Sequence, residues 1–212
     1  MDELDLLKKA WKKDTHSFEQ VSETDIYKML HRKSSSIVKW ILVISILEFA
    51  VWAAVSILFN TDDAIKSLHA ESFSIYLKIL TYVNYVVVVL FIFSFYRNYT
   101  KISTITSTKQ LMQDIIRTRK TVQYYVWYNL FMIFISAILG FVMAFVYNPK
   151  MAPLKYKIAH EDSYYTLTIT ICMIVATIVV FVGGFWLIYR LLYGILLRKL
   201  NGNYKELKKI DL

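Results

Sequence analysis

Glu48 is an acidic residue within a long apolar run, where a carboxylate is energetically unfavourable. Glu48 lies near the middle of the apolar run 37–59, roughly 16 Å from either end of a helix that rises 1.5 Å per residue. If that run crosses a bilayer, burying the carboxyl group costs a few kcal/mol, and a side chain this short cannot reach water. Glu48 therefore needs either a polar partner on a neighbouring helix or a function as a proton or ion site.

Asn84 is the polar residue at the matching depth of the next apolar run, 73–96. A hydrogen bond between Glu48 and Asn84 would satisfy both side chains if the two runs form adjacent antiparallel helices. Such bonds are worth about 0.6–2 kcal/mol in membranes. The alternative is a protonation or ion site inside the bundle, as a small transporter or channel would need. We expect the structural pair and keep the transport site open.

The remaining inventory of reactive side chains is poor. The sequence has no glycine-rich phosphate loop and no nucleophile elbow, and its single cysteine, Cys172, lies within an apolar run. His16 and His31 lie on one side of the apolar runs, and His69 and His160 lie on the other. The four histidines therefore cannot assemble one metal site. We therefore predict no catalytic residue, no metal and no cofactor, and a protein that is not an enzyme.

Four long apolar runs dominate the chain, at 37–59, 73–96, 122–147 and 164–189. Each is long enough for a helix to cross a hydrocarbon layer of ~30 Å, which takes about 20 residues. Apolar residues make up 57% of the chain and charged residues only 19%, below the quarter that is usual in soluble domains. The runs predict an all-α fold, an integral membrane four-helix bundle.

Positive charge lies mainly on one side of these runs. Eight Lys and Arg residues lie before or at the start of the first run, six between the second and third, and six after the fourth, which is 20 of the 25. Lys and Arg residues are enriched in the cytoplasmic segments next to membrane-spanning helices. We therefore expect two helical hairpins with both termini in the cytoplasm. The net charge of +9 then reflects topology and contact with the lipid bilayer, and we expect no direct nucleic-acid binding.

This topology predicts three parts: a cytoplasmic amphipathic segment at 1–36, a four-transmembrane-helix domain at 37–197 and a basic cytoplasmic tail at 198–212. Leu4, Leu7 and Trp11 share one helical face of the first part. That face either rests on the inner leaflet or docks a cytosolic partner. A capping box at Ser22 begins a second short helix, which we expect to break at 34–36, and 201–203 should end the last helix.

Small residues form stripes that suggest close helix packing. Their spacing allows backbones to approach one another within the bundle. The candidate packing residues are Ala50 and Ala54 in the first run, Ser136, Gly140 and Ala144 in the third, and Gly183 and Gly184 in the fourth.

The stretches 2–11, 26–30, 33–41 and 44–49 resemble a family of small, uncharacterised bacterial four-helix inner-membrane proteins. Some members carry the name beta-carotene 15,15'-monooxygenase, and their genes often lie beside that of a sigma factor. The resemblance implies a multi-pass regulator of the bacterial inner membrane, similar to an anti-sigma factor, with a sigma factor or another regulator as its cytosolic partner. The oxygenase name conflicts with the histidine inventory, because that chemistry needs four histidines on one iron. A regulatory or scaffolding protein is our first expectation, a transporter or channel the second and a membrane enzyme the last.

Overall fold

The computed structural model describes residues 8, 22–58, 65–66, 71–105, 107–160 and 163–210. In this part of the chain every regular element is helical, which confirms the predicted all-α class. The elements are α2 (Glu23–Leu58), α4 (Glu71–Thr104), α5 (Thr108–Tyr147), the 3-10 turn η1 (Pro149–Met151), α6 (Ala152–His160) and α7 (Ser163–Ile210).

Four of the helices, α2, α4, α5 and α7, are long and apolar enough to cross a membrane. They contain 34 to 48 residues, which corresponds to roughly 50–70 Å of helix against a hydrocarbon layer of ~30 Å. In the most apolar stretch of each span, no more than 11% of the residues are buried within the bundle. The apolar side chains therefore face outward, as expected of a multi-pass membrane protein, and each helix extends beyond its span.

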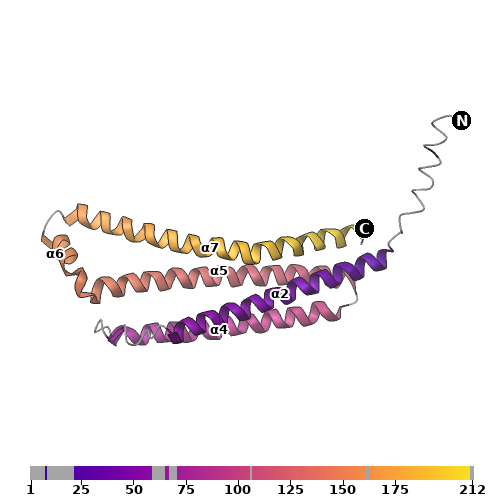
Figure 1. The fold of residues 1–212 in the computed structure, drawn as a ribbon, viewed down its shortest axis with the longest axis horizontal. Coiled ribbons are helices and arrows are strands. Elements are labelled where there is room, and N and C mark those ends of the chain that lie inside the picture. Colours follow the sequence, from indigo (N-terminus) through magenta and orange to yellow (C-terminus); the bar gives the residue numbers. More distant parts are fainter. Residues whose placement is uncertain are drawn as a thin grey trace.

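The long helices pack in a ring, with α2 against α4, α4 against α5, α5 against α7 and α7 against α2. Successive helices run in opposite directions (Figure 1). The start of α2, the α4–α5 turn and the end of α7 consequently meet at one end, and α6 lies at the other. We call the end of the bundle where α2 starts and α7 finishes the basic end, and we define it as residues 22–39, 97–121 and 190–210.

Two buried apolar clusters hold the bundle together. The basic-end core consists of seven residues with 0–2% exposure: Leu30, Val38, Ile102, Leu111, Ile115, Leu200 and Leu207. The membrane core lies next to it along the helices: Ile41, Val88, Phe95, Val122, Tyr125, Leu130, Tyr189 and Tyr193. The tightest packing of the described residues thus lies toward the basic end.

α2 and α7 are continuous where the sequence predicted interruptions. Ser22 caps the start of α2 as predicted, because the Asp25 amide donates to Ser22 Oγ at 3.2 Å. The Ser22 hydroxyl in turn donates to the Asp25 carboxylate at 2.6 Å, but α2 then runs through 34–36 without a break. Likewise α7 runs through 201–203 to Ile210. Both predicted breaks are wrong, because these polar residues face a neighbouring helix: Asn203 donates to the Ser34 hydroxyl at 3.0 Å, and Arg119 donates to Asn201 Oδ1 at 2.6 Å.

Side chains of α2 satisfy the carbonyls at the end of α4. The last four carbonyls of a helix lack partners within it. His31 Nε2 donates to the Ile102 carbonyl at 2.7 Å, and the Tyr27 hydroxyl donates to the Ile105 carbonyl at 3.3 Å. These bonds fix the start of α2 against the α4–α5 turn and so help to order the basic end.

Candidate functional site

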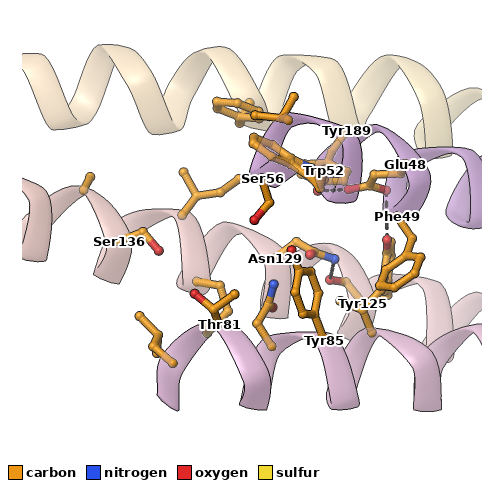
Figure 2. A pocket seen from close by; sticks show the side chains of 18 of the residues that line it. Glu48, Phe49, Trp52, Ser56, Thr81, Tyr85, Tyr125, Asn129, Ser136 and Tyr189 are labelled. Carbon is orange, nitrogen blue, oxygen red and sulfur yellow. Dashed lines mark hydrogen bonds between the residues drawn. The ribbon is translucent and has the colours of Figure 1, made fainter. Parts of the chain in front are cut away.

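Three tyrosine hydroxyls surround the carboxylate of Glu48 in α2. Tyr125 donates to Oε2 at 2.9 Å, and Tyr193 donates to the same oxygen at 3.1 Å. Tyr189 donates to Oε1. Figure 2 shows the carboxylate between the hydroxyls of Tyr125 and Tyr189. Glu48 is thereby joined to α5 by one bond and to α7 by two.

The backbone places these donors with little freedom. Tyr189 and Tyr193 are one helical turn apart on α7, so both point to the same side of it, and their rings stack at a centroid distance of 6.0 Å. The ring of Tyr125 meets that of Tyr193 edge-on at 5.8 Å and that of Phe95 at 5.4 Å. All three tyrosines are at most 4% exposed, so packing holds the hydroxyls in position around the carboxylate.

These hydrogen bonds offset part of the free-energy cost of placing a carboxylate inside a membrane span. Hydrogen bonds to a charged acceptor each contribute about 1.5–3 kcal/mol, roughly twice the value of neutral ones. Three of them replace much of the hydration that Glu48 would lose in a span. The carboxylate acts here as an acceptor held by neutral hydroxyl donors, and the described residues supply no cation to it.

A cavity of about 510 Å³ opens beside this cluster. All four long helices contribute to its wall, and Figure 2 shows Glu48, Tyr189 and Tyr125 at one end and Ser136 and Thr81 toward the other. The polar lining residues are Glu48, Ser56, Thr81, Asn84, Tyr85, Tyr125, Asn129, Ser136 and Tyr189. The apolar ones are Phe49, Trp52, Val55, Leu80, Val88, Met132, Ile133, Ala137, Phe181 and Phe185. The site is therefore a largely apolar chamber with one carboxylate at its edge.

Comparison with known proteins identifies the family. Residues 24–212 match the family described as a domain of unknown function (DUF8845). The chain belongs to this family. The match includes all four spans and the whole Glu48 site, whereas Leu4, Leu7 and Trp11 precede it. No curated protein and no solved structure is significantly similar to the chain.

The predicted pair of Glu48 and Asn84 is not formed as a hydrogen bond. Both residues line the same cavity, but the carboxylate has the three tyrosines as partners. The Asn84 Oδ1 atom is buried and has no hydrogen-bond partner among the described residues. The reason is geometric: tyrosine side chains are long enough to reach the carboxylate from α5 and α7. Glu48 and Asn84 thus line one cavity, and the sequence analysis did not include the three tyrosines that bind the carboxylate.

The predicted small-residue stripes do not form close contacts within the chain. A Cβ atom added at Gly140, Gly183 or Gly184 would meet nothing within 4 Å, and Ala50 and Ala54 are exposed. Ser136 instead lines the cavity, and Ala144 is half-buried. The described residues thus show no close helix contact at the three glycines.

Two further predictions are left open by the described residues. Leu4, Leu7 and Trp11, the candidate docking residues, lie outside them. Within them, no group of three or more His, Cys, Asp or Glu side chains could hold a metal ion. The absence of a cofactor stays a prediction.

Proposed function

We propose that this chain is a non-enzymatic regulatory or scaffolding protein of the bacterial inner membrane, which docks a cytosolic partner in the manner of an anti-sigma factor. In this proposal the four spans form two hairpins, with both termini and the basic end in the cytoplasm. The excess of Lys and Arg at that end supports the orientation. The resemblance described above makes a sigma factor the first candidate partner.

The observation that carries the proposal is the basic end itself. All four long helices continue beyond their apolar stretches and enclose a core with 0–2% exposure. A protein that needed only to anchor in lipid would have no use for this ordered extension. It offers a rigid platform directly at the membrane surface.

The surface of this platform is strongly basic. The exposed cations of the described basic end are Lys28, Arg32, Lys33, Lys39, Arg97, Lys109, Arg117, Lys120, Arg190, Arg198, Lys199, Lys205, Lys208 and Lys209. The exposed acidic side chains of the described basic end are Glu23, Asp25 and Glu206. Such a surface suits an acidic face of a partner protein, and it also suits anionic lipid headgroups.

Affinity capture of the full-length protein tests the proposal. Wild type is crosslinked in cells, purified from membranes and compared with Arg198→Glu/Lys199→Glu at the basic end. Lys150→Glu/Lys157→Glu, two exposed lysines toward the α6 end, is the matched control. We expect a sigma factor or another cytosolic regulator with wild type and the control, and its loss with the first variant. Equal capture by all three proteins, or no cytosolic protein with any of them, contradicts the proposal.

A companion variant addresses the segment before the matched family. In Leu4→Ala/Leu7→Ala/Trp11→Ala the apolar face is removed, whereas Lys8→Ala leaves it intact. If the partner docks on that face, capture falls with the triple variant alone. If the face rests on lipid, capture is unchanged.

A second candidate function is transport, which the cavity in the spans favours. A carboxylate beside a chamber at membrane depth is the arrangement expected of a coupling site. Proteoliposomes that contain wild type would then show a proton or ion flux that Glu48→Gln abolishes. Equal fluxes through wild type and Glu48→Gln would exclude this function.

A further inference from the structure

The wall of the Glu48 cavity contains an acidic side chain and no basic one among the described residues. Glu48 is the acidic residue of the wall, and among the described lining residues none is Lys, Arg or His. A carboxylate can accept about four hydrogen bonds. Oε2 accepts two and Oε1 accepts one, so Oε1 retains room for another donor. The cavity therefore presents a negative charge that is stabilised but not neutralised.

Part of the hydrogen-bond donor capacity of the wall is already used. Several lining donors are committed to protein acceptors: Thr81 donates to the Leu77 carbonyl at 2.9 Å, and Asn129 donates to the Tyr125 carbonyl at 2.9 Å. The hydroxyls of Tyr125 and Tyr189 donate to Glu48. In contrast, the buried Asn84 Oδ1 has no partner. A buried acceptor without a donor costs about 1–3 kcal/mol, so an occupant that brings N–H donors relieves a cost that an apolar occupant does not.

The apolar part of the wall is rich in aromatic rings, namely Phe49, Trp52, Tyr85, Phe181 and Phe185. Aromatic faces attract organic cations, and the attraction is larger where water is excluded. Trp52 and Phe185 lie side by side with a centroid distance of 5.9 Å. Together with the carboxylate, these rings form a surface suited to a cation with an apolar body.

The size and position of the cavity restrict the ligand further. A volume of about 510 Å³ falls in the range of sites that bind small organic molecules, ~300–1,000 Å³. The cavity lies between helices whose outer faces are apolar, so a ligand that enters sideways comes through lipid. Its apolar body must therefore be large enough to partition into a bilayer.

We propose that this cavity binds a lipophilic ammonium ion, an organic amine that is protonated at neutral pH and carries an aromatic apolar body. The ammonium group lies at the Glu48 end and donates to Oε1, and the apolar body lies against the aromatic wall. Asn84 Oδ1 is a second acceptor of the same cavity for a donor of the ligand. This inference concerns ligand binding alone, so it stands or falls independently of partner docking at the basic end.

A matched set of three probes tests the proposal. Phenylbutylamine carries the charge and the N–H donors, its trimethylammonium derivative carries the charge alone, and phenylbutanol carries neither. The full-length protein is placed in phosphatidylcholine nanodiscs, and binding is measured by calorimetry after subtraction of the signal from empty nanodiscs. We expect the amine to bind about ten-fold or more tightly than the alcohol, as one well-placed charge interaction allows. Equal affinities for the amine and the alcohol overturn the proposal.

Three variants locate the site. Glu48→Gln should remove the preference for amine over alcohol, and Asn84→Leu should weaken the amine more than its trimethylammonium derivative. Ala137→Phe fills the cavity without touching the carboxylate and should weaken all three probes by about ten-fold or more. Ala176→Phe, an exposed position of α7 outside the cavity, is the control and should change nothing.

Two outcomes of this series contradict the proposal. One is a folded Glu48→Gln protein that keeps the full preference for the amine, because the carboxylate would then not be the recognition element. The other is an unchanged amine affinity in Ala137→Phe, because the amine would then bind elsewhere. The second outcome decides the matter even if Glu48→Gln does not fold.

Discussion

The amide of Asn203 donates a hydrogen bond of 3.0 Å to the hydroxyl of Ser34, and both side chains are buried. The bond joins the last part of α7 to the first part of α2 at the basic end. Two polar side chains that are buried together satisfy one another, whereas either one alone is an uncompensated cost. This pair therefore specifies how the two ends of the described chain meet.

Replacement of Asn203 by alanine should destabilise the protein by about 1–3 kcal/mol, because Ser34 then remains buried without its partner. Thermal unfolding in detergent, followed by circular dichroism, measures the change. The double variant Ser34→Ala/Asn203→Ala should lose less than the sum of the single variants. Gly202→Ala is the neighbouring control: its Cβ meets nothing within 4 Å, so it should stabilise the helix slightly. Additive effects of the two single variants would show that the bond has no energetic role.

Loss of one hydroxyl from the Glu48 cluster should also be costly. Tyr189→Phe removes one of the three donors and is expected to destabilise the protein by ~1–3 kcal/mol, because the acceptor is a half-buried carboxylate and hydrogen bonds to charged groups are the stronger ones. Unfolding in increasing sodium dodecyl sulfate measures the loss. In a Glu48→Gln background the same change should cost less, since the acceptor no longer carries a charge. Tyr164→Phe, at a side chain that is 90% exposed, should have no effect. A loss of equal size in both backgrounds would mean that the tyrosine contributes by packing alone.

Proline substitution distinguishes a continuous α2 from two separate helices. Ser35→Pro falls in the interior of Glu23–Leu58, where proline removes a hydrogen bond and clashes with the preceding turn at a cost of about 3 kcal/mol or more. Glu23→Pro lies at the first helical position, which tolerates proline. We expect a lower melting temperature for Ser35→Pro only. Equal melting temperatures for the two variants would indicate that α2 is interrupted at 34–36.

Cysteine labelling tests the proposed orientation. In a Cys172→Ser background, which has no other cysteine, single cysteines replace the exposed residues Lys109, Lys205 or Tyr156. A membrane-impermeant maleimide should label the cysteine at Tyr156 in intact spheroplasts, and those at Lys109 and Lys205 in inverted vesicles. The reverse pattern would place the basic end outside the cytoplasm. Labelling of Lys109 and Lys205 from opposite sides would exclude the two-hairpin arrangement.

The sequence predicted the fold well because span formation depends on local properties. A run of about 20 apolar residues is long enough to form a span whatever the rest of the chain does. Each of the four expected runs falls on an observed helix, except for residue 59, which lies outside the described residues. The continuity of α2 and α7 was missed because serine, asparagine and glycine also favour helix ends. Their role at 34 and 203 depends on a contact between residues 169 positions apart, which no local pattern reveals.

The site was predicted in part for the same reason. Glu48 and Asn84 are conspicuous because a polar residue in a span is rare, and both line the cavity. The predicted site did not include Tyr125 of α5 or the pair Tyr189 and Tyr193 of α7. Their four-residue spacing on α7 was the available signal, since it places two hydroxyls on one face at the end of a span.

The small-residue stripe of α5 gives the last test. If α5 packed closely at Gly140, a leucine there would force the helices apart, at a cost of about 1–3 kcal/mol. A Cβ at Gly140 meets nothing within 4 Å, so we expect Gly140→Leu to leave the unfolding midpoint unchanged or to raise it through better helix propensity. Ser45→Leu is the contrasting variant, because Ser45 has 0% exposure in α2 and should not accommodate a larger side chain. A lowered midpoint for Gly140→Leu would show that this face packs against another helix, and crosslinking of the variant and wild type would reveal whether that helix belongs to a second copy.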